Sequence, residues 1–344
     1  MKQIEILASR NYTVTIGSGV LSQLGSTVRT VTGAHKVCIV SDSNVWPLYG
    51  KDAAESCLAS GLPICHFVFS AGENSKNATT YLELLNYLAI NQITRSDCII
   101  ALGGGVAGDL AGFAAATYLR GIPYIQVPTS LLAMVDSSVG GKTGIDLDAG
   151  KNLCGAFYQP WAVLCDTNVL KTLPEDVFRD GCAEVIKYAV LFDPELLAVL
   201  EKDGLAFDRE TVITRCIELK RDVVAADEFD RGQRMLLNLG HTIGHAIETC
   251  SNYAISHGKA VAIGMAIACR GAKSPDADRI IALLEKFGLP TTTNLAATAL
   301  WEAAQSDKKR SGQMVNLIVA NAIGDCRIVP TAIEKLKTFI EEGM

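Results

Sequence analysis

Three histidines lie close together in this 344-residue chain. His241, His245 and His257 fall within 17 positions, although the chain has only 5 histidines in all. On a helix, the four-residue spacing of His241 and His245 places both rings on one face. Such a pair can bind a divalent cation, or one ring can bind the cation while the other moves protons. The alternative is that His241 and His245 are ordinary core histidines and that His257 lies on the surface.

A glutamate and a lysine three positions apart form a second candidate. Glu184 and Lys187 stand in the sequence Ala-Glu-Val-Ile-Lys, whose apolar neighbours predict a buried helix. A buried carboxylate is costly unless a cation compensates it. A metal ion or Lys187 would do so. The same spacing is also typical of a solvated Glu–Lys pair on an exposed helix, and both interpretations remain open.

Cationic and amide side chains suggest an anionic ligand. Arg234, Asn238, His241 and His245 follow one another at helical spacing, so a predicted helix carries a polar stripe where a core face would be apolar. Further cations stand among small residues at 137–144 and 150–152. Cations grouped in an acidic protein indicate a small anionic substrate carrying phosphate and carboxylate groups.

A glycine-rich sequence predicts nucleotide binding. Gly103, Gly105 and Gly108 satisfy G-x-G-x-x-G after a predicted strand and before a predicted helix. Missing Cβ atoms let the backbone approach a pyrophosphate at a helix N-terminus. The usual acidic residue about 20 positions later is absent, but Asp42 also ends a predicted strand and could bind the ribose. Glycines can alternatively serve close strand–helix packing.

A second glycine motif is excluded. Gly141-Lys142-Thr143 resembles the end of a P-loop, but the glycine required five positions before Gly141 is Asp136. We therefore expect no use of ATP.

Composition sets the class of protein. The hydrophobic fraction of 49% and the charged fraction of 20% are ordinary for a globular chain, and a net charge of −6 argues against nucleic acid as a partner. The N-terminal sequence predicts no secretory signal, and glycines and Asp109 interrupt the apolar run near 98–119, so we expect no membrane partner. The 11 cysteines form no C-x-x-C pair, which predicts free thiols and a cytoplasmic location.

The order of predicted elements indicates two domains. Strands at 36–42, 97–102, 124–128 and 162–166 alternate with helices such as 78–90 and 106–118, which predicts a parallel, Rossmann-like sheet covered on both faces. Helices dominate afterwards, at 175–200, 208–226, 234–250, 258–270, 276–287 and 331–342, with a possible hairpin at 314–329. We expect an α/β dinucleotide-binding domain over 1–175 and a mostly α-helical metal- and substrate-binding domain over 176–344.

The chain resembles the 3-dehydroquinate synthases, a family of sugar-phosphate cyclases. The resemblance runs nearly end to end, and its most specific stretches are residues 103–109, 126–143, 183–187 and 238–245. It implies a lyase of the shikimate pathway, which leads to chorismate and the aromatic amino acids. Such an enzyme converts 3-deoxy-D-arabino-heptulosonate 7-phosphate to 3-dehydroquinate and phosphate. The implied sequence is oxidation by NAD, phosphate elimination, re-reduction, ring opening and aldol closure, so NAD is not consumed.

The resemblance also implies roles for individual residues. Zinc, or cobalt in its place, would be held by Glu184, His241 and His257. Proton-handling and hydroxyl-contacting groups would be His245, Asp230, Lys187 and Asp136. Phosphate, carboxylate and hydroxyl contacts would come from Arg120, Lys142, Asn152, Lys220, Arg234, Asn238 and Lys308. NAD contacts would come from Asp42, Asn44, Glu73, Lys76, Gly104, Gly105, Val106, Asp109, Thr129, Ser130, Lys151 and Thr172. A homodimer is implied, in which Arg120 reaches the neighbouring subunit's site.

Several positions depart from the family pattern. Asp230 stands where a glutamate that handles protons is usual, and Lys259 follows His257-Gly258 where glutamate is common. Asp146 replaces a frequent asparagine, and the sequence leaves open whether Lys308 or Lys309 reaches phosphate. Three rival functions remain: a metal-dependent polyol dehydrogenase, a sister cyclase acting on another sugar phosphate, and a binding paralogue without catalytic activity.

Overall fold

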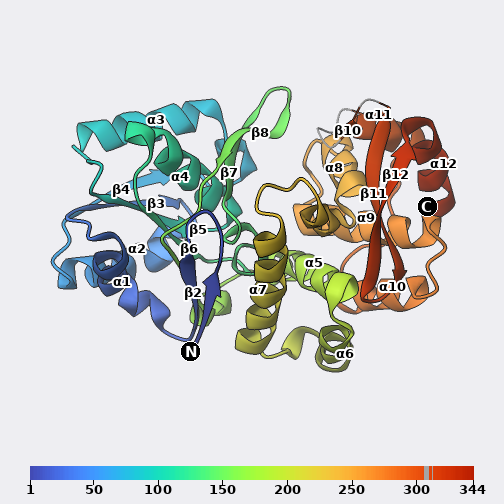
Figure 1. Ribbon diagram of the computed structural model, residues 1–344, viewed down its shortest axis with the longest axis horizontal. Coiled ribbons are helices and arrows are strands. Elements are labelled where there is room, and N and C mark those ends of the chain that lie inside the picture. The colour runs from blue at the N-terminus through green and yellow to red at the C-terminus, as the bar shows by residue number, and fades with distance from the viewer. Residues whose placement is uncertain (306–309, 312) are drawn as a thin grey trace. The chain divides into compact units, whose positions relative to one another are not determined.

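The protein consists of two compact units. The computed structural model in Figure 1 describes residues 1–305, 310–311 and 313–344. One unit comprises Met1–Leu173 and Arg209–Phe229, and the other comprises Pro174–Asp208 and Asp230–Met344. The segment 209–229 lies beyond the expected boundary at residue 175, yet its contacts group it with the first unit.

The first unit is built on a seven-stranded sheet. From edge to edge the strands follow the order β1-β2-β9-β6-β5-β3-β4. β1 pairs antiparallel with β2, whereas the other neighbours pair parallel. The parallel Rossmann-like sheet is therefore confirmed, with an antiparallel edge strand that the sequence pattern did not predict. The strands are β1 (Lys2–Ile6), β2 (Tyr12–Gly17), β3 (Val37–Asp42), β4 (Ile64–Phe69), β5 (Cys98–Gly103), β6 (Tyr124–Pro128) and β9 (Ala162–Asp166).

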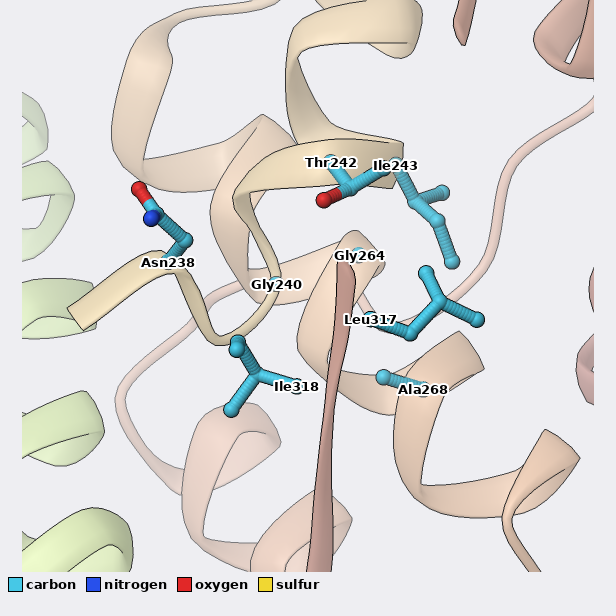
Figure 2. Close-up of a pocket in the computed structure, with 8 residues that line it drawn as sticks. All are labelled: Asn238, Gly240, Thr242, Ile243, Gly264, Ala268, Leu317 and Ile318. Atoms are coloured by element: carbon cyan, nitrogen blue, oxygen red, sulfur yellow. The ribbon is translucent and has the colours of Figure 1, made fainter. Parts of the chain in front are cut away.

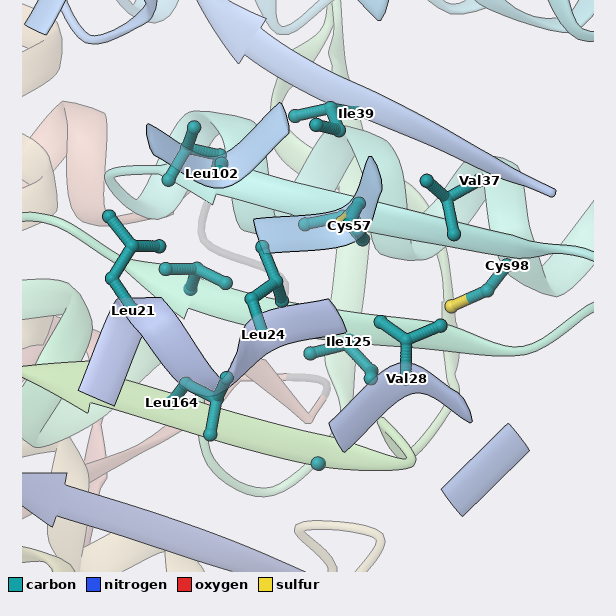
Figure 3. Packing of buried hydrophobic residues seen from close by; sticks show 14 of the residues in the cluster. Leu21, Leu24, Val28, Val37, Ile39, Cys57, Cys98, Leu102, Ile125 and Leu164 are labelled. Carbon is teal, nitrogen blue, oxygen red and sulfur yellow. The ribbon is translucent and has the colours of Figure 1, made fainter. Parts of the chain in front are cut away.

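Both faces of this sheet are buried. In β3, Val37 and Ile39 belong to one apolar cluster, whereas the alternating Cys38 and Val40 belong to another. The first cluster, shown in Figure 3, includes Leu24 and its neighbours on the covering helices. The second includes residues of the helices on the opposite face. The helices are α1 (Leu24–Thr32) and α2 (Trp46–Ala59) in the first cluster and α3 (Ala78–Ile90) and α4 (Gly105–Thr117) in the second.

The order of strands creates a switch point beside the glycine-rich loop. After β3 the chain adds β4 on one side, and β5 and β6 lie on the other side. The carboxyl ends of β3 and β5 therefore adjoin where the connections diverge, which is where open α/β sheets bind ligands. Asp42 ends β3, and Gly103 ends β5.

Smaller elements complete the first unit. β7 (Lys142–Leu147) and β8 (Gly150–Phe157) form an antiparallel hairpin, which was not predicted from the sequence. The π-helix η4 (Ala133–Ser137) precedes it, and α7 (Arg209–Ala226) packs on η4, β1 and β2. Short 3-10 helices are η1 (Val20–Gln23), η2 (Glu73–Ser75), η3 (Tyr118–Arg120) and η5 (Thr167–Lys171).

The second unit is mostly helical, as predicted. An antiparallel hairpin confirms the strands expected near 314–329. None of the helices in the described part of the chain has the length and apolar character that crossing a bilayer requires. The elements are α5 (Glu175–Phe192), α6 (Pro194–Asp203), η6 (Gly204–Ala206), η7 (Gln233–Asn238), α8 (His241–Cys250), α9 (His257–Gly271), α10 (Ala277–Lys286), α11 (Ala297–Gln305), β10 (Arg310–Ser311), β11 (Met314–Ala322), β12 (Asp325–Ala332) and α12 (Ile333–Gly343).

Two predicted helices are wrong in their extent. The helix expected over 234–250 is interrupted at Gly240, whose φ of 78° is left-handed, so η7 and α8 are separate. The helix expected over 175–200 ends at Asp193, because Asp193 caps a new helix whose first residue is Pro194. The polar stripe predicted on one helix is therefore divided between two elements.

Truncation of a core residue should test the packing of the sheet. Leu102→Ala on β5 removes a fully buried side chain and should lower the free energy of unfolding by about 2–5 kcal/mol. Leu82→Ala is the matched control, because Leu82 on α3 is 55% exposed and should change stability by less than about 0.5 kcal/mol. Urea denaturation followed by circular dichroism measures both. Equal effects would contradict the assignment of Leu102 to the core.

Candidate metal centre and nucleotide-binding loops

Glu184 lies at the centre of the candidate metal site. Its side chain on α5 is 0% exposed, and that of Lys187, one turn later, is 1% exposed. Oε2 of Glu184 forms an ion pair with Nζ of Lys187. The solvated Glu–Lys pair that the spacing also allowed is thereby excluded, and the buried alternative is confirmed.

The three predicted metal ligands lie together. Oε1 of Glu184 is 3.4 Å from Nε2 of His241 and 3.3 Å from Nε2 of His257. The ligand atoms of the three residues all lie within 4.8 Å of one another. Tetrahedral zinc with bonds of about 2.0–2.1 Å separates neighbouring ligand atoms by about 3.3–3.4 Å. The spacing and the donor set of two imidazoles and one carboxylate thus fit a divalent cation with a position open for substrate.

Each of the two histidines is oriented by a second contact. Nδ1 of His241 lies 3.1 Å from the backbone carbonyl of Leu239, and Nδ1 of His257 lies 3.6 Å from Oε1 of Glu248. Such partners would hold each ring so that its Nε2 faces a cation bound at Glu184. Glu248 was not predicted as a site residue from the sequence. Its spacing from His245 on α8 was a signal, but pairing with His257 depends on how α8 and α9 meet.

Glycines let the two histidine-bearing helices approach. A Cβ added at Gly264 of α9 would lie 2.1 Å from the backbone oxygen of Gly240. A Cβ added at Gly244 of α8 would lie 3.1 Å from the backbone oxygen of Ala260. Because His241 begins α8 and His257 begins α9, this close packing brings their rings to a centroid distance of 5.3 Å.

The surroundings of Glu184, His241 and His257 shift the pKa values of these three residues in different directions. Although burial opposes its charge, Lys187 and His241 hold the pKa of Glu184 well below its ordinary value. Burial, and then the charge of Lys187, lower the pKa of His241 to about 3. Burial opposes protonation of His257 as well, but hydrogen bonds to Glu184 and Glu248 raise its pKa to about 10.

Other predicted residues of this unit lie near the cluster in the sequence, and His245 also lies close to it in space. The ring of His245 is 5.5 Å from that of His241 and 6.3 Å from that of His257 between centroids, so the predicted shared helix face is confirmed. Arg234 is buried in η7, and Asn238 ends that element. Asp230 precedes it in a left-handed conformation with φ of 57°. Lys308, and its alternative Lys309, lie outside the described residues.

A small cavity adjoins the start of α8. Asn238, Gly240, Thr242 and Leu317 are among the residues that line it, as Figure 2 shows. Its volume of about 10 Å³ is near the least that holds one water molecule. It is therefore far too small for a sugar phosphate or a dinucleotide.

The glycine-rich loop has the geometry of an anion-binding helix terminus. α4 begins at Gly105, and its N-cap Gly104 makes no side-chain cap. A Cβ added at Gly103 would lie 3.4 Å from Oδ2 of Asp42, and one added at Gly104 would lie 3.5 Å from Oγ of Ser130. The backbone N–H of Thr129 donates to the carbonyl of Gly103. A bare helix N-terminus flanked by a carboxylate and hydroxyls fits a dinucleotide.

Further predicted NAD residues lie in other segments of the first unit, apart from Val106. Asp42 accepts hydrogen bonds at Oδ1 from the backbone N–H groups of Asn44 and Val45. Tyr49 on α2 shares a hydrogen bond with the hydroxyl of Thr172. Val106 is the second residue of α4, next to Gly105.

Lys76 joins predicted NAD residues to a predicted substrate residue. Its side chain is 5% exposed and its Nζ lies 3.1 Å from Glu73, 3.2 Å from Asp109 and 3.7 Å from Asp146. Nζ also donates to Oδ1 of Asn152 over 2.8 Å. Burial opposes its charge, but these carboxylates hold the pKa of Lys76 above its ordinary value.

The hairpin residues complete this network. Asn152, with φ of 54°, donates its backbone N–H to Oδ1 of Asp146 over 2.7 Å. Lys151 lies 3.4 Å from Glu73. Burial raises the pKa of Asp109 to about 6 despite Lys76. The segment at Glu73, the helix α4 and the hairpin β7–β8 therefore share the buried cation of Lys76.

The remaining candidates of the first unit occupy three places. Lys220, buried on α7, donates to the backbone carbonyl of Asp136 and forms an ion pair of 2.8 Å with its carboxylate. Lys142 begins β7 and is exposed. Arg120 is exposed at the end of η3, with φ of 67°.

Family models match most of the chain. Residues 66–180 match the model described as 3-dehydroquinate synthase N-terminal, and residues 181–310 match the model described as 3-dehydroquinate synthase C-terminal. The chain belongs to the 3-dehydroquinate synthase family. A relative from Enterococcus faecalis with this name is 43% identical over 99% of this chain and 98% of its own length. A relative from Pelobacter propionicus with the same name is 44% identical over 97% of each chain.

Solved structures of sister enzymes share the architecture. A 2-deoxy-scyllo-inosose synthase complexed with carbaglucose-6-phosphate, NAD+ and Co2+ is 28% identical, with a TM-score of 0.89 over 100% of both chains. The 2-epi-5-epi-valiolone synthase from Streptomyces hygroscopicus with NAD+ and Zn2+ bound is 25% identical, with a TM-score of 0.87 over 99% of both chains. An iron-containing alcohol dehydrogenase at 15% identity and a TM-score of 0.68 shares the fold.

Zinc binding should release a proton from His257. At about pH 7 the metal-free protein holds a protonated His257, whose pKa is about 10, whereas His241 and Glu184 are already unprotonated. Because the metal needs a neutral ring, about one proton should leave per ion, and affinity should rise about tenfold per pH unit towards that pKa. Calorimetry with Zn2+ in buffers of different ionisation enthalpy counts the protons. An affinity independent of pH would contradict this assignment.

Proposed function

We propose that the chain is a 3-dehydroquinate synthase, a carbon–oxygen lyase that forms 3-dehydroquinate and phosphate from 3-deoxy-D-arabino-heptulosonate 7-phosphate. The observation that carries the proposal is the cluster of Glu184, His241 and His257, in which the first two are buried and His257 is half-buried. It occurs in a chain whose relatives of that name match it nearly end to end. The reaction places the enzyme in the shikimate pathway, which supplies chorismate and aromatic amino acids.

The cofactors of the proposal are a divalent cation and NAD. When bound, Zn2+ or Co2+ supplies a Lewis acid that polarises the substrate oxygen. NAD supplies reversible hydride transfer, with the protein giving orientation. Glu184, His241 and His257 would hold the cation. The loop around Gly104 and the carboxylate of Asp42 would hold the dinucleotide, and solved neighbours crystallised with NAD+ and either Co2+ or Zn2+ support this pairing.

Cationic side chains suit a substrate that carries both a phosphate and a carboxylate. As the family resemblance implies, Lys142, Arg120 and Arg234 would bind these groups by charge-assisted hydrogen bonds. Asn152 and Asn238 would contact the phosphate or the hydroxyl groups. Lys220, held against Asp136, would fix the position of that carboxylate at the substrate.

Proton movements would be handled around the metal cluster. His245 adjoins His241 and His257, which supports a role in which its ring would exchange a proton with substrate bound at the cation. Lys187 would stabilise negative charge on the oxygen at the reacting carbon. Asp230 would assist His245, either through a bridging water or as an orienting group, because it is one methylene shorter than the usual glutamate.

The three rival functions have less support than the proposed function. A sister cyclase would be expected to match its own class better, whereas the solved sister enzymes are 25–28% identical and the 3-dehydroquinate synthases 43–44%. A polyol dehydrogenase would not need the cationic side chains that we propose for phosphate binding. A binding paralogue without activity would not need to keep all three ligand candidates at metal-binding distances.

Assembly and location complete the proposal. We expect a homodimer in which Arg120 serves the neighbouring site, as the family resemblance implies. All 11 cysteines have free thiols, which suits the reducing cytoplasm.

Turnover should require the metal and NAD without consuming either. Phosphate release from the heptulosonate phosphate should stop after chelation and resume with Zn2+, and no reduced nicotinamide should accumulate. His257→Ala should lose metal while circular dichroism remains native. Activity in metal-free protein would contradict the metal proposal, and stoichiometric reduced cofactor would favour the dehydrogenase.

The two proton-handling candidates should differ in importance. Because phosphate is a good leaving group beside a ketone, Asp230 is expected to orient rather than transfer protons. Asp230→Asn should lower kcat by less than about tenfold and Asp230→Glu should be tolerated, whereas His245→Ala should lower kcat by about a hundredfold or more. Steady-state kinetics distinguish them. A loss above about a thousandfold in Asp230→Asn would refute the orienting role.

A further inference from the structure

The helix that begins with His257 does not cap itself. Its N-cap Ser256 makes no side-chain cap bond, and the first turn of α9 contains no acidic residue. In the S-x-x-E capping box, a glutamate three positions after the N-cap closes the helix terminus. This chain has Lys259 at that position. A lysine there is unfavourable, because the N-terminus of a helix already carries partial positive charge.

A carboxylate from another helix takes the place of that cap. Oδ1 of Asp180, on α5, accepts a hydrogen bond from the backbone N–H of Lys259 over 3.0 Å. The same oxygen accepts from the hydroxyl of Ser256. Asp180 thus satisfies one of the free N–H groups of the first turn and brings negative charge to the positive end of α9.

The contact joins two metal-ligand candidates. Asp180 lies one helical turn before Glu184, so both project from the same face of α5. At Gly258, immediately after His257, an added Cβ would lie 1.9 Å from the backbone oxygen of Asp180. The start of α9 therefore rests directly on α5 at Asp180. The separation of His257 from Glu184 depends on this contact, because His257 belongs to the capped turn.

We propose that Asp180 is a positioning residue for the metal site: by capping α9 from α5, it holds His257 at metal-binding distance from Glu184. The proposal rests on the proposed function, in which these residues bind a divalent cation. It also explains how this chain accommodates Lys259, because the carboxylate that α9 lacks in its own first turn comes from Asp180.

The test measures binding of Co2+ to the metal-free protein by its visible absorption, and of Zn2+ by competition. Asp180→Ala should weaken binding of both ions by about tenfold to a hundredfold, as loss of an outer-shell partner does, and should alter the Co2+ spectrum. Asp180→Asn keeps an acceptor oxygen of the same shape and should restore most of the affinity. Adding Lys259→Glu to Asp180→Ala recreates the capping box and should also restore it.

A matched control separates positioning from general stability. Asp193, at the other end of α5, caps α6 by accepting from the backbone N–H of Leu196 over 3.0 Å. Asp193→Ala should lower the melting temperature of the metal-free protein, yet leave the Co2+ spectrum and both affinities unchanged.

The outcomes distinguish this proposal from the proposed function. If the wild-type protein binds neither ion, the proposed function fails, whatever Asp180 does. If the wild type binds and Asp180→Ala binds equally well with the same spectrum, Asp180 has no positioning role. If Asp180→Ala does not fold, the test uses Asp180→Asn and the double variant of Asp180→Ala with Lys259→Glu. A changed Co2+ spectrum in both of these variants, at a native melting temperature, would overturn the proposal.

Discussion

A single buried carboxylate governs the arrangement of the second unit. Glu184 is 0% exposed, and a charge so placed is expensive unless every oxygen has a partner. Lys187 occupies one oxygen, and the imidazoles of His241 and His257 face the other. Because α8 and α9 each begin with one of these histidines, both helices must start at the same buried point. The loops and glycines around them meet that requirement.

The glycines beside the histidines follow from the same constraint. Helix axes that pack through ordinary side chains lie about 8–10 Å apart. The α8–α9 contact instead passes through Gly240, Gly244 and Gly264, where an added Cβ would meet backbone atoms at 2.1–3.1 Å. Gly258 serves the contact of α9 with α5 in the same way. A methyl group at Gly240, Gly258 or Gly264 would collide with backbone atoms and push apart the helices that carry the candidate metal ligands.

The sequence predicted local features well and non-local ones poorly. The strands near Val37 and Cys98 and the helix 78–90 were predictable because each is a local pattern of apolar residues. The break at Gly240 was not, since its left-handed conformation depends on how α8 meets α9. The grouping of α7 with the first unit depends likewise on packing against β1, β2 and η4. The hairpin β7–β8 is rich in glycine and polar residues, so its strands carried little apolar signal.

The candidate site also combines local features that were predictable from the sequence with non-local contacts that were not. Motif residues such as Glu184 and His241 could be named from type and spacing. The partners that orient them could not, because Glu248 and Asp180 act on elements other than their own. The contacts of Lys76 were not predictable either, because the three carboxylates that it contacts and Asn152 lie in four different segments of the chain. A pattern within one segment does not reveal such contacts, whereas the fold brings them together.

The charges around the candidate metal centre indicate which ligand would complete it. A divalent cation held by neutral His241 and His257 would face the carboxylates of Glu184 and Glu248, which together match its charge. The ammonium of Lys187, paired with Glu184, leaves the cluster with one excess positive charge. Lys187 would weaken the attraction for a metal ion, but it would favour an anionic oxygen at the open position. A hydroxyl that loses its proton there is stabilised more than a neutral one. In the proposed reaction, Lys187 would therefore favour a charged substrate oxygen over the neutral alcohol, which is the kind of difference that lowers a barrier.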